Sequence, residues 1–135
     1  MKESVLAMLE EGRVREKEQT LFYRRLASEA ELRGDAELAE RLNALHADEQ
    51  HHLSRLTARL LELGGKPAKM AISHFDSPAL GDWEAVARSR EEREVDWYRG
   101  VLERGLDAAS EVLIREILES EEHHARELGG KWMSA

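Results

Sequence analysis

The sequence contains no cysteine, only two prolines, and no long hydrophobic run. The missing cysteine excludes a disulfide framework, a thiolate metal site and a cysteine nucleophile, and it is compatible with a reducing compartment. No stretch approaches the ~20 apolar residues that span a bilayer. The first twelve residues are too acidic for a signal peptide. We therefore expect a soluble, cytoplasmic protein that does not bind membranes.

Positive charge is also scarce relative to negative charge. Charged residues make up 36% of the chain and the net charge is −8, which argues against nucleic acid as a partner. Leu, Ala, Glu and Arg dominate, and this composition favours helix. The 135 residues fit one domain, at 1–135, on the usual prior of ~100–200 residues. A domain of this size buries a core without disulfides or structural zinc.

Glycine and aspartate divide the chain into segments. Gly34-Asp35 and the segment 105–107 each combine a glycine stop with an aspartate N-cap, which is typical of a tight helix–helix turn. The stretch 64–82 holds both prolines and is predicted to be a loop. The sequence thus predicts an all-α protein with helices over about 3–33, 36–63, 83–104 and 108–128.

Each predicted helix carries an apolar stripe at helical spacing, as in a helix bundle. Ionisable residues interrupt these stripes at positions where leucine is expected. A buried carboxylate without a partner costs several kcal/mol, so such groups must be paired or bound to a metal. The interrupting residues are Glu16, Glu49, His52, Glu91, Glu121 and His124.

Any one of these residues alone would be read as a surface charge or a buried salt bridge, but the pattern occurs twice. The segment 16–23 aligns with 91–98, since each begins with Glu and ends with Tyr. The segment 48–52 aligns with 120–124, since each holds a Glu-x-x-His pair. The chain therefore reads as two copies of one helical hairpin.

The turn positions give an independent test of this pairing. Residues equidistant from the turn of an antiparallel hairpin lie at the same level. The midpoint of 16 and 49 is 32.5, beside Gly34, and the midpoint of 91 and 121 is 106, inside the second turn. Each upstream glutamate is thus expected to lie level with its own Glu-x-x-His pair.

Two histidine doublets require a choice. Neighbouring helical residues point ~100° apart, so only one histidine of each doublet faces the core. We assign His52 and His124 to the core and His51 and His123 to the rim or surface. The alternative pair of Asp48 with His51 has no counterpart in the second copy.

Four glutamates and two histidines offer oxygen and nitrogen donors, which suit iron or manganese. Ionised, the four carboxylates balance the charge of two divalent ions. Two single glutamates plus two Glu-x-x-His pairs is the ligand arrangement of ferritin-like proteins. On these motifs the chain resembles the ferritin-like superfamily, and within it the rubrerythrin-like branch. The segments 91–98 and 121–124 also resemble the single hairpin of encapsulated ferritins.

The resemblance implies a ferritin-like four-helix bundle, made of two helical hairpins joined by a long crossover loop. It implies a centre of two iron ions, with manganese as the alternative, that reacts with dioxygen or hydrogen peroxide. By the same resemblance Glu49 and Glu121 bridge the metals, Glu16 and Glu91 are terminal ligands, and His52 and His124 each bind one metal. Tyr23 and Tyr98 would be catalytic residues that hydrogen-bond the carboxylates or accept an electron, or else plain core aromatics.

Two departures from the family qualify this reading. The chain lacks the four-cysteine iron domain of rubrerythrins, so an electron donor would be a separate protein. Peroxidase-type rubrerythrins have an extra glutamate five residues before the tyrosine of the third helix, and this chain has Arg93 at that position. Glu94 is one residue out of register. The difference favours ferroxidase or oxidase chemistry over peroxidase chemistry. The competing interpretations are an iron-binding or storage-associated module without turnover, and a purely structural bundle held by salt bridges.

The length of the central loop predicts its path. If the four helices ran alternately up and down, the end of the second helix and the start of the third would lie only ~10 Å apart along the bundle axis. A loop that crosses the length of the bundle must instead span ~33 Å. About 19 residues reach over ~60 Å when extended, so we expect parallel second and third helices. The rival is pairing with a hairpin of another subunit. In either case we expect a homodimer, because Phe22, Trp83 and Trp97 exceed what the metal-facing stripe can bury.

Overall fold

The computed structural model describes residues 2–71 and 77–129, which form four α-helices and one short 3-10 turn. The helices are α1 (Lys2–Leu32), α2 (Ala36–Glu62), α3 (Trp83–Leu102) and α4 (Ala108–Glu127), and the turn η1 spans Leu80–Asp82. Every helix begins and ends within two residues of its predicted boundary, so the all-α prediction is confirmed. Among the described residues, no helix is both long enough and apolar enough to cross a membrane.

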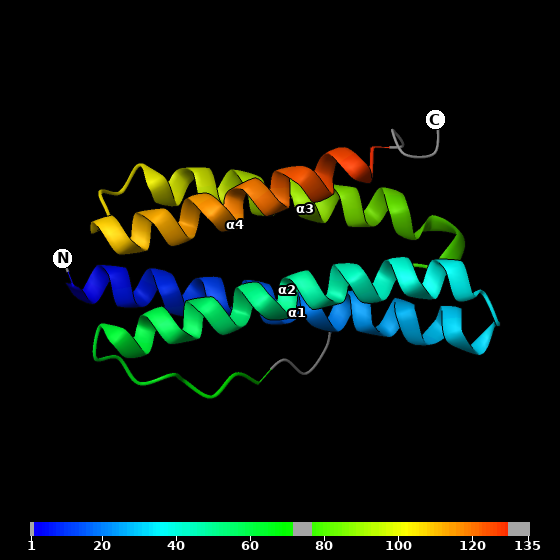
Figure 1. Cartoon of the computed structure of the whole chain (residues 1–135), viewed down its shortest axis with the longest axis horizontal. Coiled ribbons are helices and arrows are strands. Elements are labelled where there is room, and N and C mark those ends of the chain that lie inside the picture. The colour runs from blue at the N-terminus through cyan, green and yellow to red at the C-terminus, as the bar shows by residue number, and fades with distance from the viewer. Residues whose placement is uncertain (1, 72–76, 130–135) are drawn as a thin grey trace. The chain divides into compact units, whose positions relative to one another are not determined.

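The chain divides into two compact units, Met1–Leu80 and Gly81–Ala135. In the first unit α1 and α2 lie side by side and run in opposite directions (Figure 1). In the second unit α3 and α4 do the same. Each unit is thus a helical hairpin, as the sequence repeat predicted.

The two hairpin turns use the same residues in the same order. Gly34 and Gly105 have φ of +74° and +75°, in the left-handed region that glycine adopts without a Cβ clash. Asp35 and Asp107 then cap α2 and α4, and each carboxylate accepts a hydrogen bond at 3.1 Å from the backbone N–H three residues further on. These local signals explain why the predicted helix boundaries agree with the structure.

Two glycines of the second hairpin are expected to respond oppositely to alanine. Gly105→Ala should cost roughly 1–2 kcal/mol, because a side chain disfavours its left-handed backbone. Gly100→Ala should stabilise by about 0.5–1 kcal/mol, since Gly100 lies in α3 with open space around its Cβ position. Urea unfolding of both variants measures the difference, and equal effects would contradict this account of the turn.

Apolar side chains of the predicted stripes form most of the core. Phe22 and Trp83 are among the buried residues, whereas Trp97 is partly exposed. The prediction of a homodimer assumed that these three aromatics are not buried within the chain, and two of them no longer support it. The largest fully buried side chains are Tyr23, Tyr98, Phe22, Met8, Leu9, Leu26, Leu42, Leu56, Leu60, Ile114, Ile117 and Gln19.

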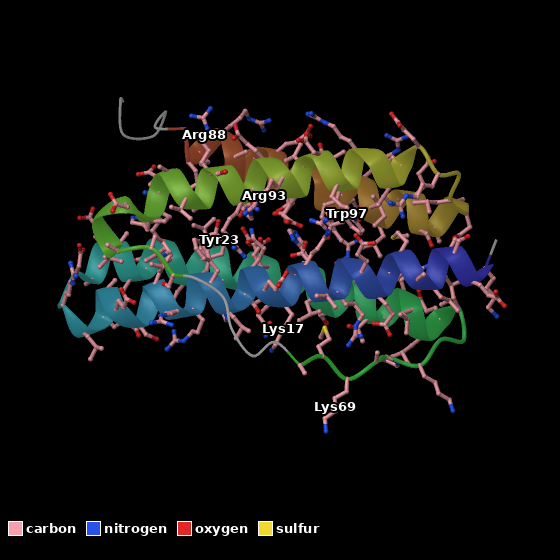
Figure 2. All side chains as sticks on the ribbon, turned by 180° about the vertical axis from the view of Figure 1, so that it is seen from behind. Lys17, Tyr23, Lys69, Arg88, Arg93 and Trp97 are labelled. Atoms are coloured by element: carbon pink, nitrogen blue, oxygen red, sulfur yellow. The ribbon has the colours of Figure 1, made fainter. Side chains whose placement is uncertain are left out.

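The segment after α2 turns back along α1. The buried Arg13 donates from Nε to Thr57 Oγ1 at 2.9 Å and from Nη1 to Glu10 and to the backbone oxygen of Ala68. The Ala68 N–H in turn donates to Glu10 Oε2 at 2.7 Å. These bonds hold the linker against α1, while the side chain of Lys69 projects away from it (Figure 2). The first part of the loop therefore follows the path that a crossover along the hairpin requires.

Candidate metal centre

The first hairpin gathers one ligand from α1 and two from α2. His52 Nδ1 lies 3.4 Å from Glu16 Oε1 and 3.1 Å from Glu49 Oε1. Both glutamates are fully buried, and the exposed fraction of His52 is 4%. We call Glu16, Glu49 and His52 the first half-site.

The second hairpin repeats this arrangement. His124 Nδ1 lies 3.5 Å from Glu91 Oε1 on α3 and 3.1 Å from Glu121 Oε1 on α4. Glu91 and Glu121 are fully buried, and His124 is 3% exposed. We call Glu91, Glu121 and His124 the second half-site. The sequence repeat is therefore also a repeat of side-chain geometry.

Helix periodicity explains how the residues of each half-site meet. The glutamate and histidine of a Glu-x-x-His pair are three residues apart, so they share one face of the helix. The contact between Glu16 and His52 shows that Glu16 lies level with this pair across the hairpin, as the turn positions predicted. His51 and His123, one residue earlier in each doublet, are exposed. The structure thus agrees with the assignment of His52 and His124 to the core.

Each half-site has the donor set that a divalent cation requires. The three residues can each offer one ligand atom, and in both half-sites these atoms lie within 4.8 Å of one another. Carboxylate oxygen and imidazole nitrogen are the donors that iron, manganese and other first-row divalent ions accept. Two buried carboxylates side by side also favour a nearby positive charge. The residues of each half-site therefore fit a metal ion.

In the metal-free chain, the imidazole of His52 supplies part of that positive charge. Burial lowers the pKa of His52, but hydrogen bonds to Glu16 and Glu49 and the charges of these two carboxylates outweigh burial and raise the pKa to about 9. His52 is thus protonated at neutral pH when no metal is bound. Metal binding must displace this proton, because a ligating histidine is neutral.

This pKa predicts how the stability of the metal-free chain depends on pH. His52 has a pKa near 6.5 when unperturbed and about 9 in the folded chain. Its stabilising contribution is therefore fully present below pH 6.5 and is lost as the pH rises through about 9. We expect the melting temperature of the metal-free chain to fall over this range, and to fall less in His52→Gln. Parallel declines in the two proteins, measured by thermal circular dichroism, would refute the prediction.

Sequence reasoning missed Gln19 and set Glu94 aside as off register, but both residues are buried on the helices that carry the upstream glutamates. Gln19 is buried, and its Nε2 donates to Glu49 Oε2 at 3.3 Å. The aligned residue of the second hairpin is Glu94, which is 8% exposed. Both lie three residues after the upstream glutamate and thus on the same helix face. Counting from the upstream glutamate of each repeat, and not from the tyrosine, was the signal that could have identified this position.

The two predicted catalytic tyrosines lie in equivalent places. Tyr23 and Tyr98 are fully buried, each seven residues after the upstream glutamate of its hairpin. Each packs edge-on against the preceding aromatic ring, with centroid distances of 5.2 Å to Phe22 and 4.9 Å to Trp97. This packing accounts for both tyrosines as core residues, and a role in chemistry stays a prediction.

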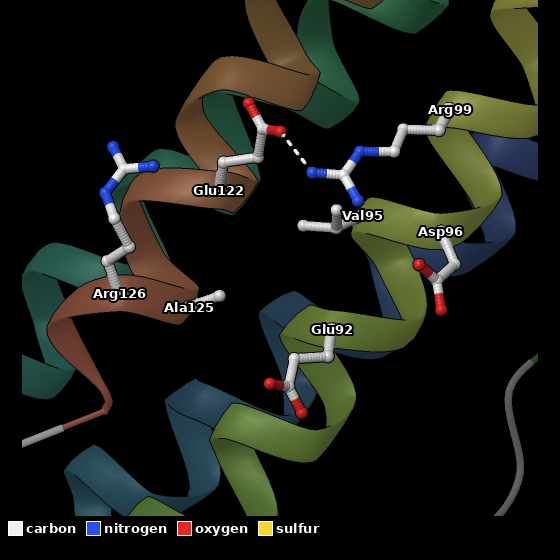
Figure 3. Close-up of a pocket in the computed structure, with 7 residues that line it drawn as sticks. All are labelled: Glu92, Val95, Asp96, Arg99, Glu122, Ala125 and Arg126. Carbon is white, nitrogen blue, oxygen red and sulfur yellow. Dashed lines mark hydrogen bonds and ion pairs between the residues drawn. The ribbon is translucent and has the colours of Figure 1, made fainter.

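A surface groove of about 460 Å³ lies between α3 and α4 in the second hairpin (Figure 3). Glu92 and Glu122 line it, each directly following a residue of the second half-site in the sequence. Arg99 crosses the groove to Glu122 at 2.7 Å. The lining includes none of the six predicted ligands, so the groove is separate from the proposed metal ligands.

Comparison with known proteins identifies the fold. No family model and no curated protein sequence matches the chain. Among solved structures, the chain is similar to bacterioferritin of Desulfovibrio desulfuricans, whose X-ray structure was described for its diiron site in different catalytic states. The two are 22% identical, with a TM-score of 0.88 over 96% of this chain and 78% of that chain. The chain therefore has the ferritin-like four-helix fold that its motifs resemble.

Proposed function

We propose that the two half-sites together hold one two-metal centre, and that the chain oxidises Fe(II) with dioxygen or hydrogen peroxide there. The observation that carries this proposal is the duplicated, buried Glu–Glu–His geometry, with His-to-carboxylate distances that nearly match in the two hairpins. Two matched clusters supply ligands for two ions. Similarity to a bacterioferritin with a diiron site supports iron as the metal.

The ligand roles follow the family resemblance. Glu49 and Glu121 would bridge the two ions, with Glu16 and His52 completing one position. In the second hairpin, Glu91 and His124 would complete the other position. Bound iron supplies the one-electron redox chemistry that no side chain of this set provides. Manganese remains the alternative metal, because it accepts the same donors.

The surrounding residues position the ligands and exclude water. Gln19 orients Glu49 through its hydrogen bond, and the buried rings of Tyr23 and Tyr98 cover the same helix faces as the upstream glutamates. Close to the carboxylates, the tyrosine hydroxyls would donate hydrogen bonds or release an electron. When Fe(II) is the substrate, each Fe(II) supplies one electron to the oxidant. Because the chain has no cysteine for a thiolate iron site, reduction of peroxide without Fe(II) as substrate would instead draw electrons from a separate donor protein.

We propose that the two half-sites of one metal centre belong to the same copy of the chain. The linker leaves α2 and is held against α1 at Ala68, so it starts along the path of a crossover that would make α2 and α3 parallel. Pairing with the hairpins of a second copy would give the same ligand set. A homodimer is expected in either case, so sedimentation of the metal-loaded chain tests the dimer itself, and a monomer would refute it.

Anaerobic loading with Fe(II) followed by rapid mixing tests the function. We expect two Fe(II) per pair of half-sites, and a fast absorbance rise in the near ultraviolet on mixing with dioxygen, with peroxide, or with both. Tight Fe(II) binding without an absorbance change would instead identify an iron-binding module. If neither Fe(II) nor Mn(II) binds stoichiometrically, the proposal is wrong and the chain is a structural bundle held by salt bridges.

A further inference from the structure

The two hairpins end in the same five residues. Glu-Leu-Gly-Gly-Lys stands at 62–66, at the end of α2, and again at 127–131, at the end of α4. The two exits also share their backbone hydrogen bonds. Leu63 and Leu128 donate to the oxygen four residues earlier, and Gly64 and Gly129 donate to the oxygen three residues earlier. The repeat therefore extends beyond the ligands to the point where each hairpin ends.

In the first hairpin, the residues after this exit bind along α1. Gly65 lies so close to the helix that a Cβ atom there would come within 2.8 Å of Leu6 Cδ2. Ala68 then donates its N–H to Glu10 and accepts at its oxygen from Arg13, whose side chain also bonds α2. The linker thus passes along α1 as an extended chain, which advances about twice as far per residue as a helix.

A groove lies at the corresponding place of the second hairpin. Its volume is about 460 Å³, and it runs beside α3 next to Gly129, the last described residue. Counted from the upstream glutamate of each hairpin, Ala85 and Arg88 of this groove correspond to Glu10 and Arg13, which hold the linker. The groove is therefore on the face of the second hairpin that the linker covers in the first.

This groove continues into the one shown in Figure 3, because Glu92 lines both. We call the two grooves together the α3 track. From Arg88 to Arg99 the track measures ~16 Å at the rise of a helix. Residues 130–135, which follow Gly129 and lie outside the described residues, reach ~20 Å when extended. They are long enough to follow the track over this length.

The α3 track and the segment 130–135 are complementary in charge and polarity. Four carboxylates and three guanidinium groups line the track, which leaves one negative charge. Val95 and Ala125 form an apolar part of it, one from each helix (Figure 3). The segment reads Gly-Lys-Trp-Met-Ser-Ala, so one cation is followed by two large apolar side chains.

We propose that residues 130–135 bind in the α3 track, as the linker binds along α1. Glu92 accepts a backbone N–H of the segment, as Glu10 does in the first hairpin, and Lys131 balances the charge of the track. Trp132 and Met133 cover the apolar part. Since α3 and α4 have 20 residues each, against 31 and 27 in α1 and α2, the bound segment extends the core of the shorter hairpin. This inference is independent of the proposed metal chemistry.

Amide hydrogen exchange of the metal-free full chain, followed by NMR, tests this binding. The amides of residues 131–133 should exchange at least about tenfold more slowly than in an unfolded chain, because they are held in the track. Glu92→Ala should remove most of this protection. Glu116→Ala is the matched control and should leave it unchanged, because Glu116 is an exposed glutamate of α4 and is not among the residues that line the track.

Glu10→Ala measures the same effect on a contact that the structure shows. It should speed the exchange of the Ala68 amide, which donates to Glu10 Oε2, and leave residues 131–133 protected. Exchange of residues 131–133 at the unfolded rate in the wild type, or protection that survives in Glu92→Ala, would overturn the inference. Protection that disappears on dilution would also overturn it, because the segment would then bind a second copy of the chain.

Discussion

Replacing Glu49 and Glu121 together by alanine is expected to weaken binding of both metal ions by more than about 100-fold. These two fully buried carboxylates are the proposed bridging ligands, so their loss affects both positions at once. Residues that only support a ligand already contribute 10–100-fold to metal affinity, and loss of direct ligands should exceed that range. Calorimetry with Fe(II) under anaerobic conditions, together with metal analysis after gel filtration, measures the loss.

The control is Gln50→Ala combined with Glu122→Ala, which changes the residue directly after each ligand. Glu122 belongs to a surface ion pair with Arg99, and such pairs contribute ~0–1 kcal/mol, so the control should fold and bind two ions. Full metal binding by the Glu49 and Glu121 variant would show that neither residue is a ligand. Loss of binding in the control as well would point to a general structural effect.

Metal loading is expected to raise the melting temperature of the chain by about 10 °C. An ion present at 100 times its dissociation constant stabilises the folded state by ~2.7 kcal/mol, and each kcal/mol shifts the melting temperature by several degrees in a domain of this size. The physical cause is that Glu16, Glu49, Glu91 and Glu121 gather negative charge in buried positions. A bound cation removes the resulting repulsion.

Differential scanning calorimetry of the metal-free and metal-loaded chain gives this shift directly. The double variant His52→Ala with His124→Ala should lose most of it, because each half-site would keep only its two carboxylates. His51→Ala with His123→Ala is the matched control, since both of these histidines are exposed. An unchanged melting temperature with stoichiometric metal bound would contradict the electrostatic account.

Local signals in the sequence determined the elements of this protein. Gly34 with Asp35, and Gly105 with Asp107, end one helix and begin the next through bonds that span only a few residues, so their effect can be read without the fold. The duplicated Glu and Glu-x-x-His pattern likewise needed only helix periodicity to place the ligands of each hairpin on one face and at one level.

Only the tertiary structure decided which side chains meet across helices. The bond from Gln19 to Glu49 and those of Arg13 to Thr57 and Ala68 join residues 30 to 55 positions apart. The burial of Phe22, which removes part of the argument for a dimer, also comes from such contacts. Helix periodicity determines the face of the helix on which a side chain lies. The contacts, burial and pKa of that side chain depend on the residues of the neighbouring helix that face it. Capping and spacing act along the chain, whereas the charge balance of each half-site is set between helices.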